Sequence, residues 1–196
     1  MKLATICVQG AYRPKNGERR VVTIVQSTTF KYDSSVEMGD LFDLKKSGYF
    51  YSRLQNPTCD TVAAKIAMLE GGVAGMLTGS GQAANFYAIF NIAGAGDHIV
   101  SSTAIYGGTY NLFNVTLRKL GIDFTFVSPS ATEEELAAAI RPNTKAIFGE
   151  TISNPSLEIL DIEKFARVAH KAGVPLIVDN TFATPINCRP FDFGCD

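Results

Sequence analysis

The residues best suited to bind an anion lie in the stretch 78–85, which reads TGSGQAAN. An apolar run before it, 73–77, predicts a strand, and the apolar spacing after it predicts a helix over 81–93. The first N–H groups of a helix have no partner inside it, and the helix dipole adds partial positive charge there. Gly79 and Gly81 let the backbone approach a ligand closely, and the Ser80 hydroxyl adds a donor. The stretch therefore predicts a phosphate site; the alternative is a serine that only caps the helix.

Tyr51 and Arg53 form a second pattern with phosphate chemistry. They are two residues apart in a segment that we expect to be extended, so their side chains leave the same face. A phenol beside a guanidinium makes a good phosphate clamp. An exposed ion-pair partner next to a core-edge aromatic is the alternative, and these two residues taken alone favour it.

Asp179 predicts a different kind of contact. It follows the apolar strand expected at 174–178, so its carboxylate emerges at the end of a strand. A carboxylate there is costly to bury unless it meets a cation, and the protonated pyridine nitrogen of pyridoxal phosphate (PLP) is such a cation. Tyr106 offers a ring that could stack on a flat cofactor, and Asn154, before Pro155, could donate to a ring oxygen. Singly, these residues also fit a turn, a core aromatic and a loop.

Strands and helices alternate in the part of the chain that carries these residues. Strands are expected at 98–102, 122–127, 145–149 and 174–178, and helices at 109–119, 133–140 and 161–171. Thr132 and Glu135 predict a capping box, and Asp161 begins the last helix. This order predicts an α/β fold with a mostly parallel sheet covered by helices on both faces. Ligands of such sheets bind beyond the carboxyl ends of the strands, where Ser80, Tyr106, Asn154 and Asp179 are all expected.

Residues 1–55 follow another pattern. A strand-like run at 21–25 leads into a polar connection without a sustained helical or alternating period. We expect an N-terminal arm that lies over a neighbouring subunit, or a partly mobile segment, followed by a PLP-binding large domain over 56–196. In that domain Thr58 is expected to cap a helix over 59–70 that Gly71 and Gly72 end.

Composition excludes several classes of protein. The 196 residues are 46% hydrophobic with a net charge of −1, which argues against a nucleic-acid or anionic-membrane surface. No apolar run is long enough to span a bilayer. Two histidines and four cysteines without CxxC spacing argue against a metal site or a disulfide framework, so we expect a reducing cytoplasm.

A dinucleotide is the main alternative ligand, because residues 79–84 also fit G-x-G-x-x-A. That interpretation needs an acidic residue at the far end of the next strand, whereas Asp97 lies at its start. No GK[ST] follows the glycines, so a P-loop is excluded. A nucleotide-dependent oxidoreductase is therefore disfavoured.

These residues together resemble the PLP-dependent enzymes of cysteine and methionine metabolism, a branch of the aspartate aminotransferase (type I PLP) fold. Five motifs, ordered along nearly the whole chain, carry the resemblance. They are Tyr51-x-Arg53-x-x-Asn56-Pro57-Thr58, Ser80-Gly81-Gln82-Ala83-Ala84, Tyr106-Gly107-Gly108-Thr109-Tyr110, Glu150-x-x-x-Asn154-Pro155 and Val178-Asp179-Asn180-Thr181.

The resemblance implies a role for each site residue. The backbone at Gly81 and Gln82, next to Ser80, would hold the PLP phosphate. Tyr51 and Arg53 would reach the phosphate of a neighbouring subunit. Tyr106 would stack on the ring and help in leaving-group or proton chemistry. Asp179 would pair with the pyridine nitrogen, and Asn154 would contact the ring hydroxyl.

Within the family, Gln82 and residues 107–113 look most like those of O-acetylhomoserine sulfhydrylases. The implied reaction is γ-replacement, in which O-acetylhomoserine and sulfide give homocysteine and acetate in methionine biosynthesis. Methionine γ-lyases typically carry a cysteine where Gly108 stands, so that activity, with cystathionine γ-synthase or γ-lyase, is the alternative. The family also implies a homotetramer built as a dimer of dimers.

One family feature is missing. The Schiff-base lysine belongs to a Ser-x-Thr-Lys segment shortly beyond the Asp179 motif, and none of the lysines in the 196 residues has that context. We therefore expect an N-terminal half without turnover of its own. A catalytically silent fragment that acts only as an assembly module is the alternative from another class.

Overall fold

The structure is a computed structural model that describes residues 1–196, and the chain forms two compact units. The first comprises Met1–Leu77 and the second Thr78–Asp196. The boundary between these units differs from the 55/56 division expected from the sequence. Contact between residues 1–55 and a neighbouring subunit stays a prediction.

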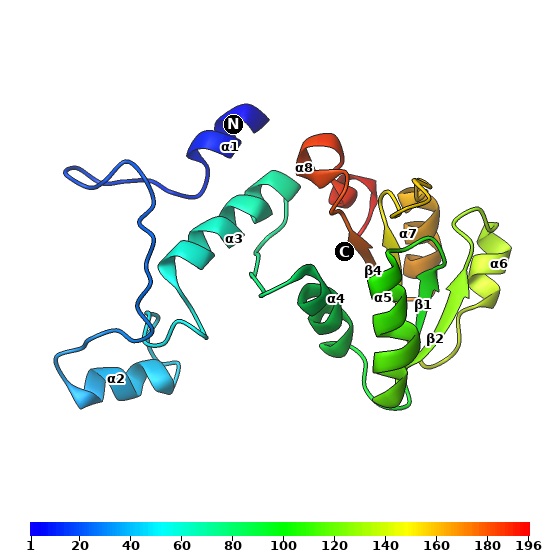
Figure 1. The fold of residues 1–196 in the computed structure, drawn as a ribbon, viewed down its shortest axis with the longest axis horizontal. Helices are drawn as coiled ribbons and strands as arrows, with labels where there is room; N and C mark the ends of the chain where they lie inside the picture. Colours follow the sequence, from blue (N-terminus) through cyan, green and yellow to red (C-terminus); the bar gives the residue numbers. More distant parts are fainter. The chain divides into compact units, whose positions relative to one another are not determined.

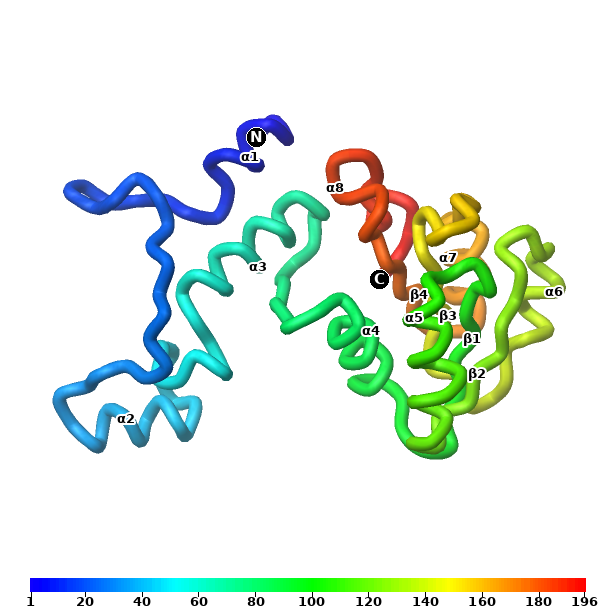
Figure 2. The backbone as a smooth tube through the Cα atoms, in the orientation of Figure 1, coloured from blue at the N-terminus to red at the C-terminus, as the bar shows by residue number.

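The second unit is an α/β domain built on four parallel strands in the order β2-β1-β3-β4 (Figure 1). Figure 2 traces the chain through these strands. The strands are β1 (His98–Ser102), β2 (Asp123–Val127), β3 (Thr144–Glu150) and β4 (Leu176–Asp179). The helices are α4 (Gly81–Phe90), α5 (Gly107–Asn111), the π-helix η1 (Leu112–Leu117), α6 (Glu133–Ala138), α7 (Ile162–Lys171), α8 (Thr184–Asn187) and the 3₁₀-helix η2 (Pro190–Phe193). The predicted fold class is confirmed.

Neighbouring residues of each strand face opposite sides of the sheet, which produces two cores. Ile99 of β1 packs with Ile89 of α4 and Phe113 of η1 in one cluster. Val100, the next residue, packs with Leu136 of α6 and Phe165 of α7 in the other. Helices therefore cover both faces, as predicted, and the carboxyl ends of the strands lie between these two layers.

Local signals explain where several of these helices begin. The Thr132 hydroxyl accepts from the Glu135 N–H, and the Glu135 carboxylate accepts from the Thr132 N–H, which confirms the capping box of α6. Asp161 caps α7 by accepting from the Lys164 N–H at 3.0 Å.

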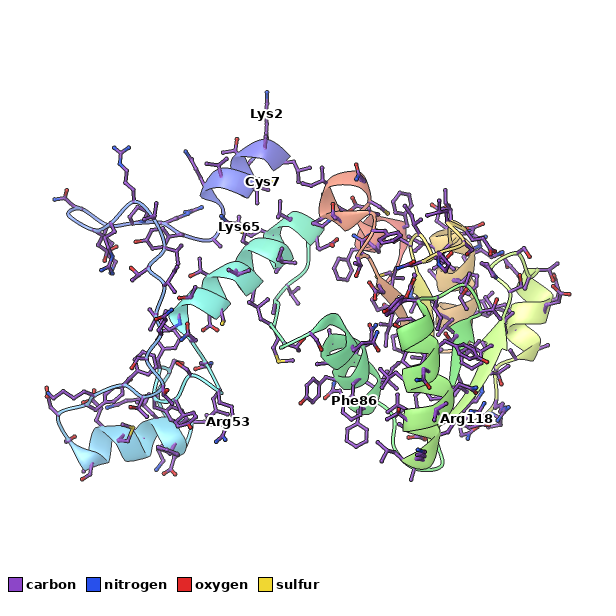
Figure 3. The ribbon with its side chains drawn as sticks, viewed as in Figure 1. Lys2, Cys7, Arg53, Lys65, Phe86 and Arg118 are labelled. Atoms are coloured by element: carbon purple, nitrogen blue, oxygen red, sulfur yellow. The ribbon has the colours of Figure 1, made fainter.

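The first unit contains α1 (Leu3–Gln9), α2 (Ser35–Phe42) and α3 (Pro57–Glu70). Asn56, and not Thr58, caps α3, because the Asn56 side chain accepts from the Thr58 N–H and Pro57 occupies the first helical position. The Lys65 ammonium donates to the Cys7 carbonyl at 3.2 Å and so joins α3 to α1 (Figure 3).

Two predicted strands are wrong, at 21–25 and at 73–77. A strand needs a partner for its backbone groups, which an apolar run alone does not provide. Residues near 25 instead bond to side chains, since the Val25 N–H donates to the Thr58 hydroxyl. At Gly75 an added Cβ would lie 2.6 Å from the Ala63 carbonyl oxygen, so this segment packs along α3 instead of joining the sheet. The sheet consequently has four strands, and Asp179 ends the fourth.

His98 is the first residue of β1, so it lies at the end of the sheet opposite the carboxyl ends of the strands, and it is fully buried. Its ring nitrogens lie 2.7 Å from the Thr144 hydroxyl and 2.9 Å from the Thr125 hydroxyl. Burial lowers the pKa of His98, and the positive charge of Arg141 lowers this pKa further. Protonation in the folded state is therefore opposed by lost solvation and by charge repulsion.

We expect His98 to make the chain less stable in acid. Its folded-state pKa is below the unfolded value of about 6.5, so the unfolded state takes up the proton first as the pH falls. Urea unfolding between about pH 7.5 and about pH 5 should show a loss of stability that is smaller in His98→Gln. His170→Gln removes the exposed histidine and should retain the loss. An equal acid-induced loss in wild type and His98→Gln would contradict this assignment.

No helix of the chain has both the length and the apolar character needed to cross a membrane.

Candidate functional site

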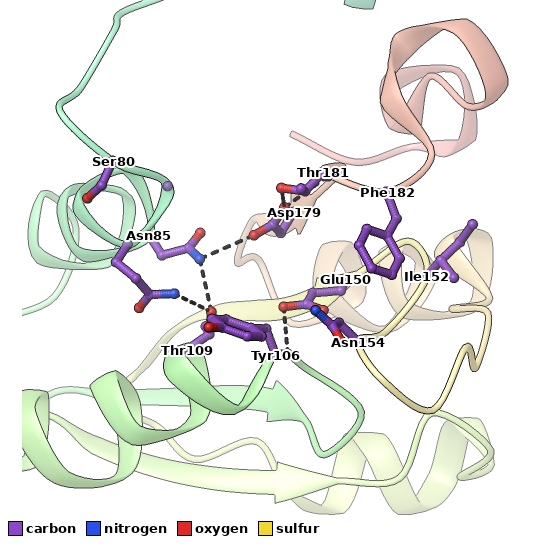
Figure 4. Close-up of a pocket in the computed structure, with 12 residues that line it drawn as sticks. Ser80, Asn85, Tyr106, Thr109, Glu150, Ile152, Asn154, Asp179, Thr181 and Phe182 are labelled. Carbon is purple, nitrogen blue, oxygen red and sulfur yellow. Dashed lines mark hydrogen bonds between the residues drawn. The ribbon is translucent and has the colours of Figure 1, made fainter.

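A cavity of about 400 Å³ opens at the carboxyl ends of the strands in the second unit (Figure 4). The residues that line it come from α4 and its N-cap, from α5 and the residue before it, from the last residues of β3 and β4, and from the loops after these two strands. They are Ser80, Gly81, Gln82, Asn85, Tyr106, Thr109, Glu150, Ile152, Asn154, Asp179, Thr181 and Phe182. The cavity thus brings together six of the eight predicted site residues, although Ser80, Gly81 and Gln82 reach it from the start of α4 and do not follow a strand as expected.

The start of α4 provides free N–H groups. Ser80 caps the helix, since its hydroxyl oxygen accepts from the Ala83 N–H at 3.1 Å. The Ser80 carbonyl accepts from the Ala84 N–H, which begins the regular helical pattern. The N–H groups of Gly81 and Gln82 therefore have no partner inside the helix. The capping role and the anion site, posed as alternatives from the sequence, are compatible here, because the cap leaves these two donors available.

Asp179 ends β4 and holds a defined orientation. Its Oδ1 accepts from the Thr181 N–H at 3.0 Å and from the Thr181 hydroxyl at 2.5 Å. Its Oδ2 accepts from the Asn85 amide at 3.2 Å. The carboxylate is half-buried, and each of its oxygens has a donor. A cation in the cavity would therefore meet a negative charge that is already oriented.

Glu150 is the carboxylate that sequence reasoning left without a role. It ends β3 directly beside Asp179 in the sheet register, and only 6% of it is exposed. The Tyr106 N–H donates to its Oε1 at 2.8 Å. Burial raises the pKa of the Glu150 carboxyl and the nearby Asp179 charge raises it further, whereas bonds from the backbone N–H groups of Tyr106 and Asn154 oppose both effects.

Glu150→Gln should remove a pH-dependent contribution to folding. Because the folded-state pKa of Glu150 is raised, its contribution is present below the unfolded value of about 4.3 and is lost as the pH rises through the folded-state value. Glutamine can still accept from Tyr106 but cannot ionise. Between about pH 4 and about pH 7, the free energy of unfolding of Glu150→Gln should rise relative to wild type. The exposed Glu158→Gln is the control, and parallel profiles for wild type and Glu150→Gln would refute the assignment.

Tyr106 and Asn154 stand near this carboxylate. The Tyr106 side chain is 47% exposed, so its ring is available to a ligand. Asn154 lies in the loop after β3 and is followed by a cis peptide bond to Pro155. Figure 4 shows Tyr106, Glu150 and Asn154 gathered on one side of the cavity.

Tyr51 and Arg53 belong to the first unit and do not line this cavity. The Arg53 guanidinium lies 4.9 Å from the centroid of the Tyr51 ring, so the two side chains meet. They do so across a turn and not along the extended segment expected from the sequence, because the Leu54 N–H donates to the Tyr51 carbonyl. Figure 3 labels Arg53 in the first unit. Their role as a phosphate clamp stays a prediction.

Asn85 and Thr109 also line the cavity and were given no role from the sequence. Thr109 is 1% exposed, and its hydroxyl accepts from the Gln82 amide at 3.0 Å and from the Asn85 amide at 3.2 Å. The three-residue spacing of Gln82 and Asn85 along α4 is the signal that could have revealed Asn85, because it places both amides on one helix face.

The residues fit PLP on structural grounds. One side of the cavity has backbone donors at a helix start, which suit a phosphate. Another side has an oriented carboxylate, which suits a protonated ring nitrogen. An exposed tyrosine ring and an asparagine amide lie between loops at the same strand ends. The fold and site thus define a parallel α/β domain with a pocket for a flat, phosphorylated, cationic ring.

Comparison with known proteins gives the family. The family model for Cys/Met metabolism PLP-dependent enzymes matches residues 4–196, and the chain belongs to this family. It is 51% identical over 177 residues to O-acetyl-L-homoserine sulfhydrylase of Corynebacterium glutamicum, covering 90% of this chain and 40% of that protein. It is 48% identical over 178 residues to homocysteine synthase of Schizosaccharomyces pombe, covering 90% and 41%.

Comparison with solved structures supports the same family. A Campylobacter jejuni structure assigned as an O-acetylhomoserine (thiol)-lyase, with an N'-pyridoxyl-lysine-5'-monophosphate, has a TM-score of 0.95 and 39% identity over all of this chain and 48% of that one. Cystathionine γ-lyase of Lactobacillus plantarum, complexed with L-serine, has a TM-score of 0.88 and 36% identity, covering 100% and 49%. The chain therefore spans less than half the length of these relatives.

Proposed function

We propose that this chain is the cofactor-binding part of an enzyme that converts O-acetylhomoserine and sulfide into homocysteine and acetate. The observation that carries the proposal is the cavity that joins the start of α4 to Asp179, in a chain 51% identical to an O-acetyl-L-homoserine sulfhydrylase. Under this proposal the protein is a PLP-dependent transferase acting on a small amino acid.

Each site residue has a part in holding the cofactor. The N–H groups of Gly81 and Gln82 donate to the phosphate, with the Ser80 hydroxyl beside them. Asp179 holds the proton on the ring nitrogen, Tyr106 stacks on the ring, and Asn154 donates to the ring hydroxyl. When bound, PLP withdraws electrons from the amino-acid substrate. The protein strengthens this withdrawal, because the Asp179 charge keeps the ring nitrogen protonated.

Tyr106 is the residue best placed to act on the substrate. Its backbone N–H is anchored on Glu150, while the residue is 47% exposed and lines the cavity. We assign its phenol a role in proton transfer near the leaving group, in addition to stacking. The anchored backbone limits how far the ring can move, which favours a fixed geometry for that transfer.

Tyr51 and Arg53 complete the proposal as a phosphate clamp for a neighbouring subunit, in a homotetramer built as a dimer of dimers. Their cation–π contact holds the guanidinium and the phenol together, ready to meet one phosphate. Residues 1–55 would then act as the arm expected from the sequence.

Assays on the intact source protein distinguish replacement from elimination. Homocysteine formation from O-acetylhomoserine plus sulfide should exceed 2-oxobutyrate release from methionine. The reverse order would favour a methionine γ-lyase, the second candidate. Absence of any cofactor-dependent absorbance would overturn the PLP proposal as a whole.

The 196 residues alone are proposed to lack turnover. No lysine is among the residues that line the cavity, whereas a related structure carries a pyridoxyl-lysine. Borohydride treatment of the isolated chain with PLP should therefore fix no cofactor to one lysine of the chain. Specific reduction onto a single lysine would contradict this part of the proposal.

A further inference from the structure

A row of two amides and one hydroxyl joins the start of α4 to Asp179. The Gln82 amide donates to the Thr109 hydroxyl at 3.0 Å, and the Asn85 amide donates to the same hydroxyl at 3.2 Å. The Asn85 amide nitrogen also donates to Oδ2 of Asp179 at 3.2 Å. Figure 4 shows Asn85 between Thr109 and Asp179, with dashed lines to both.

The orientation of the Asn85 amide follows from its neighbours. A carboxylate oxygen only accepts hydrogen bonds, so the group facing Asp179 must be the NH₂ and not the carbonyl. An amide NH₂ has two hydrogens, and two acceptors surround it here. Asn85 is 8% exposed and Thr109 is 1% exposed, so little water competes for these bonds.

Asn85 is the one side-chain donor that reaches Oδ2 of Asp179. Thr181 donates twice, but both of its bonds go to Oδ1. Held through Oδ1 alone, the carboxylate plane could rotate, and the adjacent Glu150 carboxyl would repel it. The bond from Asn85 opposes both changes. Its anchor is Thr109, and Gln82 ties that anchor to the start of α4.

We propose that Asn85 is a positioning residue that fixes the Asp179 carboxylate plane against the ring nitrogen of the cofactor, with Thr109 as its anchor. The inference rests on the proposed function, because it takes Asp179 as the partner of that nitrogen. It extends the proposed function, because a side chain of α4 would make the site prefer a ring with a protonated nitrogen over a ring without one.

The test compares two cofactors on the cofactor-free form of the intact source protein. One is pyridoxal phosphate, and the other is its analogue with CH in place of the ring nitrogen. A charge-assisted contact should favour pyridoxal phosphate by about 10- to 100-fold in Kd. In Asn85→Leu this ratio should fall by about 10-fold, while binding of the analogue stays the same.

Each outcome has a separate meaning. A wild-type protein without preference would overturn the proposed pairing of Asp179 and hence the proposed function. A wild-type preference that Asn85→Leu retains would overturn the inference alone. If Asn85→Leu weakened the binding of both cofactors equally, Asn85 would have a purely structural role, and the inference would also be overturned.

Two variants support the comparison. Asn91→Ala changes an exposed asparagine at the other end of α4 and should keep the wild-type ratio. Thr109→Val keeps the shape of the anchor without its hydroxyl, so the ratio should fall as in Asn85→Leu. If Asn85→Leu fails to fold, as judged by circular dichroism, the smaller Asn85→Ala is measured by the same ratio.

Discussion

Gly108→Ala is expected to reduce homocysteine formation from O-acetylhomoserine and sulfide by about 100-fold in the intact source protein, while the protein remains folded. An added Cβ at Gly108 would lie 2.5 Å from Cε1 and 3.1 Å from Cδ1 of the Tyr106 ring. Carbon atoms prefer separations of about 3.5–4.0 Å, so the ring must move by on the order of 1 Å. A displacement of that size near the reacting atoms can cost about 10²-fold in rate.

Gly107→Ala is the matched control. Gly107 and Gly108 are the first two residues of α5, but an added Cβ at Gly107 would meet no atom within 4 Å. Alanine in place of a helical glycine is expected to stabilise by about 0.4–1 kcal/mol where the space is open. Turnover and thermal unfolding are measured for both variants. Equal activity of the two would show that Gly108 does not set the position of the Tyr106 ring.

The second unit was predictable because its signals are local. The strand at 98–102 matches β1 in both bounds, and the helix expected at 161–171 differs from α7 by one residue. Thr132 and Asp161 bind backbone N–H groups within a few residues, so their effect does not depend on distant parts of the chain. Apolar runs that are followed by such caps could therefore be assigned correctly.

The run at 73–77 shows the limit of that reasoning. Its residues are as apolar as those of a buried strand, yet Val73 is fully exposed. What decides its structure is the close approach of Gly75 to Ala63, a contact across twelve residues that no local pattern announces. Helix α2, in the polar arm, was also missed, because the Ser34 cap is a short local signal without a sustained helical period after it.

The site was predictable to the extent that topology determines it. Residues that directly follow parallel strands meet at one edge, which brought Asp179 and Asn154 together with Tyr106 from sequence alone. The supporting contacts were not predictable in the same way. The bonds of Thr109 to Gln82 and Asn85 depend on how α5 packs against α4, which strand order does not specify.

Asp179→Asn is expected to lower turnover of the intact source protein by about 10²–10³-fold. Asparagine has the shape of aspartate, and its carbonyl oxygen can still accept from Thr181. It has no charge, however, and cannot hold a proton on a ring nitrogen. Removal of one preorganised electrostatic contact from an active site typically has an effect of this size.

A measurement of thermal unfolding separates this loss of turnover from a loss of the fold. Asp179 lies beside Glu150 in the sheet, and its charge raises the pKa of the Glu150 carboxyl. Neutralising Asp179 removes that repulsion, but the new NH₂ faces the Asn85 NH₂ in place of the acceptor Oδ2, so Asp179→Asn should unfold at a slightly lower temperature than wild type and still be folded at the assay temperature. Asp192→Asn, in an exposed ion pair with Arg189, is the control and should keep full activity. Turnover of Asp179→Asn within about threefold of wild type would contradict the electrostatic role, because losing a charge-assisted contact costs about 1.5–3 kcal/mol and hence at least about tenfold.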